Sequence, residues 1–193
     1  MNQRLSILWF AGRGYVLAAL LGLLVRMRMY SDASLHWEFL GLVIIGLALR
    51  FWAGAYLGPH GNSMRTESPI LLREGPYRFS RNPLYIANIF IGAGLILFEN
   101  CLPSWIALLL IALLIIHHSI LIRWEENNLR INWGKDYADY MRSTARWFGW
   151  KNSGVSSSYR NPAQWNKVWI WQGRNFAYTI LSVLVLWGAS RWK

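Results

Sequence analysis

Long apolar runs constrain this chain more than any other feature of its sequence. A helix needs about 20 apolar residues to cross the ~30 Å hydrocarbon core of a bilayer. Five segments approach that length, and they cover residues 5–25, 39–57, 84–98, 103–122 and 168–189. The run at 103–122 is the clearest, and the polar residues His117, His118 and Ser119 interrupt its apolar part. The sequence therefore predicts an all-α, multi-pass integral membrane protein with about five transmembrane helices.

Composition agrees with a membrane setting. Hydrophobic residues make up 54% of the 193 residues and charged residues only 15%, whereas a soluble domain carries about a quarter charged residues. These values exclude a disordered chain and fit an ordinary soluble enzyme poorly. The formal net charge of +11 suits either nucleic acid or a membrane surface. The apolar runs, with 13 tryptophans and nine tyrosines for the headgroup zone, favour the membrane and no nucleic-acid partner.

The distribution of basic residues predicts the orientation. The connectors 58–83 and 123–167 hold four and eight of the 20 Lys and Arg residues, whereas the connector 99–104 holds none. Because basic loops stay in the cytoplasm, we expect the two long connectors inside and the short one outside. Arg26 and Arg28 argue against this orientation but are outnumbered. A bacterial inner membrane, with the active site facing the cytoplasm, is the expected location.

We expect three parts along the chain. Residues 1–57 form an N-terminal two-helix hairpin, and residues 58–150 form a core that carries the polar motifs. Residues 151–193 add a Ser/Gly-rich linker and a further C-terminal helix.

The first polar motif is the Arg81-Asn82-Pro83 sequence before the third apolar run. Asn82 fits the N-cap of a helix and Pro83 its first position. A helix N-terminus offers unpaired N–H groups that can hold a carboxylate. The alternative is a plain helix start whose basic residues anchor to phospholipid.

The second motif is the Glu125-Glu126 pair, which follows the fourth apolar run. Paired carboxylates directly below a membrane span are uncommon, because the anionic leaflet repels them. Glu125 can bind an ammonium group. The alternative is that Arg123 simply neutralises one of the two charges.

The ordered set of motifs resembles a known superfamily. Its members here are Gly75, Tyr77, Arg81, Pro83 and Tyr85, then, after a hydrophobic hairpin, Glu125, Glu126, Leu129, Gly134, Tyr137 and Tyr140. This pattern, within residues 50–148, resembles the isoprenylcysteine carboxyl methyltransferase and phospholipid methyltransferase superfamily, whose members are multi-pass membrane enzymes that use S-adenosylmethionine.

The resemblance implies a cofactor-binding set. It comprises Asn62, Pro69, Ile70, Leu71, Leu72, Tyr77, Asn82, Pro83, Leu84, Tyr85, Glu125 and Glu126. Two local features depart from the family. Asn82 stands where a histidine is common, and asparagine cannot act as a base near neutral pH. The segment 144–148 lacks the proline that often follows the tyrosines.

Two residues in apolar surroundings complete the candidate site. His118 shares a helix face with Ile122 and Glu125, so it can lie near the methyl acceptor and take its proton. The alternative is a histidine bonded to a neighbouring group. Arg50 either snorkels toward the cytoplasm or contacts an anionic headgroup. The predicted catalytic residues are thus Glu125, Asn82 and His118, and the predicted substrate-binding residues are Arg123 and Arg50.

The predicted function is methyl transfer from S-adenosylmethionine to a lipid or lipophilic molecule that enters from the bilayer. Two alternatives remain at this point. One is a membrane reductase of the sterol-reductase type, which needs a nicotinamide cofactor. The other is a membrane scaffold without enzymatic activity.

Overall fold

The computed structural model describes residues 18–58, 71–149 and 162–192. Every regular element in these three ranges is helical. Residues 18–29 form a first helix, and four α-helices follow. These are α2 (Leu40–Leu57), α3 (Pro83–Glu99), α4 (Ser104–Ser143) and α5 (Val168–Ala189). Short 3-10 helices precede three of them: η1 (Trp37–Phe39), η3 (Gly75–Arg78) and η4 (Trp165–Lys167).

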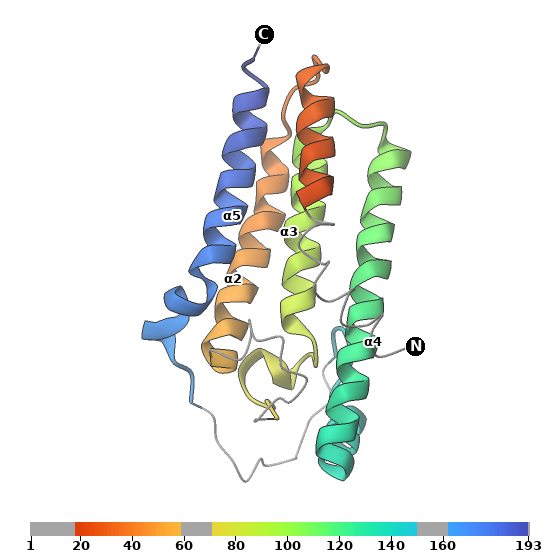
Figure 1. The fold of residues 1–193 in the computed structure, drawn as a ribbon, viewed down its shortest axis with the longest axis vertical. Coiled ribbons are helices and arrows are strands. Elements are labelled where there is room, and N and C mark those ends of the chain that lie inside the picture. The colour runs from red at the N-terminus through yellow and green to blue at the C-terminus, as the bar shows by residue number, and fades with distance from the viewer. Residues whose placement is uncertain (1–17, 59–70, 150–161, 193) are drawn as a thin grey trace.

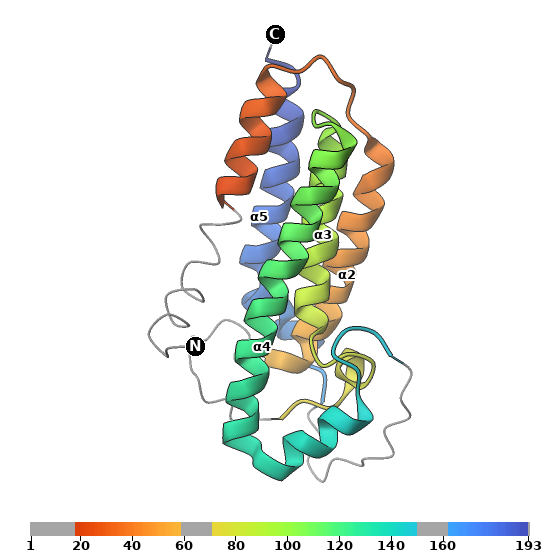
Figure 2. The ribbon, with the colours of Figure 1, turned by 90° about the vertical axis from the view of Figure 1, so that its right-hand side faces the viewer.

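The helices lie side by side along one long axis (Figure 1). Helices α3 and α4 form an antiparallel hairpin, and α2 and α5 pack beside α3. The connector 30–36 and the turn 100–103 lie at one end of the bundle, called here the turn end (Figure 2). Residues 71–82 and the last part of α4 lie at the opposite end, called here the loop end. Both polar motifs are therefore at the loop end.

Two helical stretches are long and apolar enough to cross a membrane. They are Trp37–Leu57, which includes η1, and Ser104–Ser143. Pro83–Glu99 is apolar but shorter. Within the described residues, two of the five predicted spans thus have both the length and the mean hydropathy that crossing a membrane requires.

The apolar runs predict most helix bounds to within one residue. The fifth run coincides with α5, and the second and third lie within one residue of α2 and α3. The first run differs, because its helix continues to residue 29 and includes Arg26 and Arg28 rather than leaving them in a connector. Residues 1–17 lie outside the described part of the chain.

The fourth helix differs most from its prediction. It does not end near residue 122 but continues to Ser143, so the Glu125-Glu126 pair lies within it. The physical reason is that charge does not end a helix. No glycine or proline interrupts the sequence after Ser104 until Gly134.

Glycines allow the helices to approach closely. A Cβ on Gly46 of α2 would lie 2.7 Å from Ile91 Cγ1 and 2.8 Å from the Ala87 carbonyl oxygen, both on α3. A Cβ on Gly54 would lie 2.6 Å from Cγ of Gln172 on α5. Small residues that permit such backbone contact are typical of helix packing in bilayers. They position α2 between α3 and α5.

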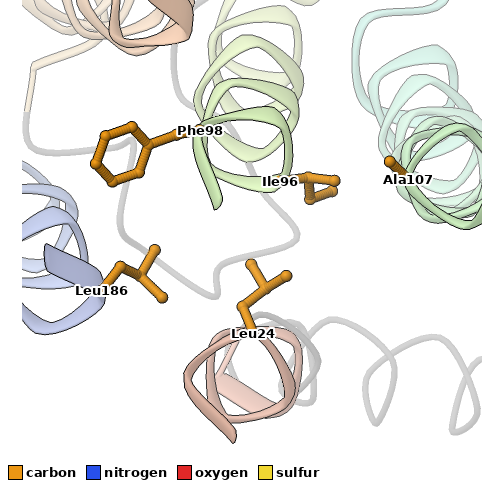
Figure 3. Close-up of a cluster of buried hydrophobic side chains, with 5 residues drawn as sticks. All are labelled: Leu24, Ile96, Phe98, Ala107 and Leu186. Atoms are coloured by element: carbon orange, nitrogen blue, oxygen red, sulfur yellow. The ribbon is translucent and has the colours of Figure 1, made fainter. Parts of the chain in front are cut away.

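A cluster of buried apolar side chains closes the turn end (Figure 3). It comprises Leu24, Ile96, Phe98, Ala107 and Leu186. These side chains come from the first helix, α3, α4 and α5, so the cluster joins four helices that are distant in sequence. The turn end is thus packed with apolar groups, and the polar contacts of the loop end stand apart from it.

Candidate functional site

The site is built around the turn that precedes α3. Gly75 begins η3 with φ of 58°, a left-handed value that suits glycine. Pro83 occupies the first turn of α3, and Asn82 is its N-cap residue, as the sequence predicts. The backbone thus changes from an irregular segment to a helix at Asn82, which is buried.

The carboxylate of Glu126 is the centre of the site. Its Oε1 accepts hydrogen bonds from Arg81 Nε at 3.0 Å and from Asn82 Nδ2 at 3.2 Å. Its Oε2 accepts from Arg146 Nε at 3.0 Å and Nη2 at 2.6 Å. The Arg81-Asn82-Pro83 turn and the Glu125-Glu126 pair, which the α3–α4 hairpin separates in sequence, therefore meet at the loop end.

These four donors fill the acceptor positions of Glu126. A carboxylate has about four lone-pair sites, and the Glu126 side chain is only 5% exposed. Burial alone would raise the pKa of Glu126, but the hydrogen bonds and charges of Arg146 and Arg81 outweigh burial and hold the pKa below its usual value. Glu126 is therefore an ionised group that orders its neighbours.

Backbone carbonyls in the last turn of α4 and just after it complete the network. Arg81 Nη1 donates to the carbonyls of Met141 at 2.9 Å and Thr144 at 2.8 Å, and the Arg81 N–H donates to the carbonyl of Ala145 at 2.9 Å. Asn82 Nδ2 also donates to the carbonyl of Arg146 at 3.1 Å. The turn before α3 is thus held against the end of α4 through both side chains and backbone.

A kink in α4 makes these contacts possible. Gly134 has φ of 46° and ψ of −116°, which is not helical. Beyond it the helix runs back toward the segment before α3 (Figure 2). Tyr140 Oη donates to the carbonyl of Tyr77 at 2.6 Å, and Arg73 Nη2 donates to the carbonyl of Asp136 at 2.6 Å. The polar part of α4 on both sides of the kink, together with the three residues after the helix, is called here the α4 elbow (residues 123–146).

Asn82 differs from its predicted role in one respect. Its side chain makes no capping hydrogen bond to α3, because the amide is directed to Glu126 and to the Arg146 carbonyl. The Asn82 N–H donates to Ser80 Oγ at 3.0 Å, and the N–H groups of Tyr85 and Ile86 donate to the Asn82 carbonyl. Pro83 has no N–H, so this helix end has few groups left to bind a carboxylate.

Glu125 lies beside a second group of residues. It is half-buried, in contrast to Glu126. Burial raises the pKa of Tyr77 well above its usual value, and the charge of Glu125 raises it further, whereas Arg50 lowers it. These electrostatic effects place Glu125, Tyr77 and Arg50 in one region. The Arg50 guanidinium donates a hydrogen bond to Asn88 Oδ1 on α3, so it has a partner within the bundle.

His118 is buried and bonded to its own helix. Its Nδ1 lies 2.8 Å from the carbonyl oxygen of Leu114. Because a carbonyl only accepts, Nδ1 carries the hydrogen, and Nε2 keeps a lone pair in the neutral ring. The ring of His118 also meets the ring of Tyr85 edge-on, with 5.8 Å between centroids. Of the two alternatives for His118, the structure therefore shows a histidine that bonds to a neighbouring group, through Nδ1.

Some of the remaining predicted site residues lie outside the described part of the chain, and the others lie within it. Asn62, Pro69 and Ile70 lie outside the described residues. The others are Leu71 and Leu72, which are half-buried in an irregular segment, Pro83, which is buried, and Leu84, which is half-buried. Arg123 is exposed on α4.

The sequence interpretation missed Arg146 and left Arg81 out of the site. Both residues bind Glu126 directly. The sequence offers one signal for these arginines, because a glutamate that becomes buried needs cationic partners. However, Arg146 is 20 residues from Glu126 in sequence. Only the kink at Gly134 shows that the two residues are neighbours.

Comparison with known proteins identifies the class. A family model described as phospholipid methyltransferase matches residues 36–136, which is just over half of the chain. The chain belongs to this family. The match contains Asn82 and both glutamates, whereas Arg146 and α5 lie beyond it. No curated protein and no solved structure matches the chain.

Proposed function

We propose that this protein is an integral membrane methyltransferase. It moves a methyl group from S-adenosylmethionine to a lipid or lipophilic acceptor. One observation carries the proposal: in a chain of the phospholipid methyltransferase family, Asn82 and Glu126 from the two halves of the motif are in direct contact at one end of an apolar bundle.

The membrane orientation is part of the proposal. The first helix, α2, α3, α4 and α5 cross the bilayer, and the loop end faces the cytoplasm with its many basic residues. Arg28 supports this orientation, because it is buried and donates to the carbonyls of Glu99 at 3.1 Å and Ala33 at 2.6 Å. It is therefore not a free surface charge at the turn end.

The residues at the loop end fit S-adenosylmethionine in a specific way. Glu126 has no acceptor position left, so it orders the turn and does not bind the cofactor. Glu125 is half-buried and holds the methionine ammonium. The rings of Tyr77 and Tyr85 pack against the adenosyl group. The bound cofactor supplies a sulfonium methyl group that is already activated for transfer.

The protein contributes position and the exclusion of water. Alignment of two reactants can supply about 7–11 kcal/mol of a barrier. The Glu126 network fixes the Arg81-Asn82-Pro83 turn against α4, so Tyr77 and Glu125 keep a constant separation. His118 accepts the proton of the acceptor at Nε2, since Nδ1 is committed to Leu114.

Binding of S-adenosylhomocysteine tests the proposal. The full chain in lipid nanodiscs is titrated with this product analogue by calorimetry, for wild type and Glu125→Gln. The proposal expects binding by wild type and at least a tenfold weaker affinity in the variant. Glu38→Gln is a matched control, because Glu38 is 66% exposed and lies in η1 at the other end of α2.

A lipid-extract assay identifies the acceptor. Protein, radiolabelled S-adenosylmethionine and a total lipid extract are incubated, and the labelled product is identified by mass spectrometry. Unchanged affinity in Glu125→Gln would remove Glu125 from the cofactor site. Absence of both binding and label transfer in wild type would reject the methyltransferase, and oxidation of a nicotinamide cofactor would then favour the reductase.

A further inference from the structure

We propose that the α4 elbow contains a second ligand site, which binds a phosphate group, as in the headgroup of an anionic lipid. A cavity of about 250 Å³ lies in the elbow. It is lined by Arg123, Glu126, Asn127, Arg130, Met141 and Arg146. The proposal rests on the proposed membrane orientation but not on methyl transfer, so a failure of the enzymatic assay leaves it intact.

The fold brings the lining residues together from two directions. Arg123, Asn127 and Arg130 follow an i, i+4, i+7 spacing, so they share one face of α4. The kink at Gly134 then turns the chain back, and Arg146 forms part of the opposite wall. Three guanidinium groups therefore border one small space, although Arg146 is far from the other two in sequence.

The charges around the cavity are not balanced. Among the described residues that line it, Glu126 is the only acid. Its carboxylate already accepts four hydrogen bonds, one of them from Arg81, which lies outside the lining. Arg123 and Arg130 are exposed and form no ion pair with any residue in the described part of the chain. Within the described part of the chain, their two positive charges thus have no acidic partner.

The chemistry and the depth of the site both favour phosphate. A guanidinium presents a planar set of N–H donors that matches phosphate oxygens, so Arg123 and Arg130 together can contact several oxygens. Arg146 already donates through Nε and Nη2 to Glu126 and adds its positive charge to the cavity wall. Arg123 is the first charged residue after the apolar part of α4. Arg130 lies about 10 Å farther along the helix, at a rise of ~1.5 Å per residue. In the proposed orientation this is the depth of the lipid phosphates at the cytoplasmic surface.

Calorimetry on the full chain in detergent micelles tests the site. The probes are dihexanoyl phosphatidic acid, dihexanoyl phosphatidylcholine and inorganic phosphate, at physiological ionic strength. We expect phosphatidic acid to bind, and the Arg123→Gln/Arg130→Gln double variant to bind it at least tenfold more weakly. Both arginines are exposed, so the double variant is expected to keep the thermal unfolding midpoint of wild type.

A matched variant separates a built site from general surface charge. Arg142 is an exposed arginine in the same segment whose side chain pairs with Asp139, and it does not line the cavity. Arg142→Gln is expected to bind phosphatidic acid as wild type does. An equal loss in this control or unchanged affinity in the double variant would overturn the proposal. Phosphatidylcholine carries a phosphate whose charge the choline offsets, so equal binding of this lipid would overturn the assignment of the site to an anionic headgroup.

Inorganic phosphate distinguishes the source of the ligand. If it binds much more weakly than phosphatidic acid, the site takes a lipid headgroup whose acyl chains add to the affinity. If both bind equally, and both lose affinity in the double variant, the site takes a free phosphate. Absence of binding by every phosphate probe would reject the site.

Discussion

The two ends of the bundle each bury a glutamate, and the two carboxylates have opposite surroundings. At the loop end, Glu126 accepts four hydrogen bonds from Arg81, Asn82 and Arg146. At the turn end, Glu99 is completely buried, and neither of its carboxylate oxygens accepts a hydrogen bond of regular geometry in the described residues, where its polar neighbours are the Cys101 thiol and Arg28. Its nearest cation, Arg28, donates to the backbone carbonyl of Glu99 rather than to its carboxylate.

This difference indicates which end of the bundle holds its polar side chains in fixed positions. Burying a charge is costly unless hydrogen bonds and opposite charge compensate it. The Glu126 network has that compensation, and it joins three segments that are far apart in sequence. Glu99 lacks it, and the turn end is held instead by the apolar cluster around Leu24 and Phe98. The loop end is thus the rigid polar end, where a small ligand can be held in a fixed position.

Replacing each glutamate by glutamine is the strongest test of this contrast. Glu126→Gln leaves Arg81 and Arg146 with buried positive charge, so we expect a loss of about 3 kcal/mol in the free energy of unfolding. This is the lower end of the usual cost, because the Arg146 side chain is 40% exposed. Glu99→Gln replaces a buried carboxyl group whose oxygens accept no hydrogen bond of regular geometry in the described residues, and we expect a change within about 1 kcal/mol.

Chemical unfolding in detergent micelles, followed by tryptophan fluorescence, measures both values. The two substitutions are chemically identical, so each is the control for the other. Equal losses at the two ends would contradict the proposed difference. A larger loss for Glu99→Gln would reverse it and would indicate that Glu99, through neighbours such as Arg28 and Cys101, stabilises the fold more than Glu126 does.

Acidification should affect the loop end through the same network. The pKa of Glu126 is held below its usual value of 4.5 in the folded protein. Its contribution to stability is therefore complete above that value and is lost as the pH falls through the lower folded-state pKa. We expect the free energy of unfolding to decrease on acidification below about pH 4.5, and Glu126→Gln to show a weaker decrease. Parallel pH profiles of wild type and variant would exclude Glu126 as the cause.

The sequence predicts the helices of this protein better than its side-chain contacts. The bounds of α5 follow from an apolar run in the sequence. The kink in α4 does not follow from an apolar run, because it depends on a single glycine, Gly134, in the polar part of the helix. The proximity of the Asn82 turn to the glutamate pair follows from the hairpin between them.

The role of Asn82 shows why side-chain contacts are harder to predict. Its N-cap position follows from local sequence, but the direction of its side chain is set by Glu126, an acceptor 44 residues away. Which of the two glutamates binds Arg146 depends on the helix face that is turned toward Arg146. That face is known only when the kink at Gly134 is known.

Residues with a positive φ lie at both ends of the bundle, and substitutions at one such residue from each end test the contrast with a smaller expected loss of stability. Gly134 at the loop end has φ of 46° and ψ of −116°, a combination that side chains other than glycine avoid. Asn100 at the turn end has φ of 47° and ψ of 20°, which asparagine tolerates. No atom lies within 4 Å of a Cβ on Gly134, so the cost of Gly134→Ala is in the backbone alone.

We expect about 2 kcal/mol of destabilisation for Gly134→Ala and about 1 kcal/mol for Asn100→Ala, by the same unfolding measurement. Gly134→Ala should also weaken the binding of phosphatidic acid several-fold, because the elbow depends on this kink. Gly41→Ala is a suitable control, since Gly41 is helical and a Cβ there meets no atom within 4 Å. Unchanged stability of Gly134→Ala would show that the elbow does not require glycine.

The smallest expected effect concerns the hydrogen bond from Tyr140 to Tyr77. Tyr140→Phe removes the hydroxyl that donates to the buried Tyr77 carbonyl at 2.6 Å, and we expect a loss of about 1 kcal/mol. Because this bond holds η3 against α4, the variant should also bind S-adenosylhomocysteine several-fold more weakly. Tyr30→Phe, an exposed tyrosine at the turn end, should change neither quantity. A stability loss in Tyr140→Phe with unchanged ligand affinity would mean that the elbow stabilises the fold without positioning Tyr77, and the rigid loop end would then be a structural feature separate from the cofactor site.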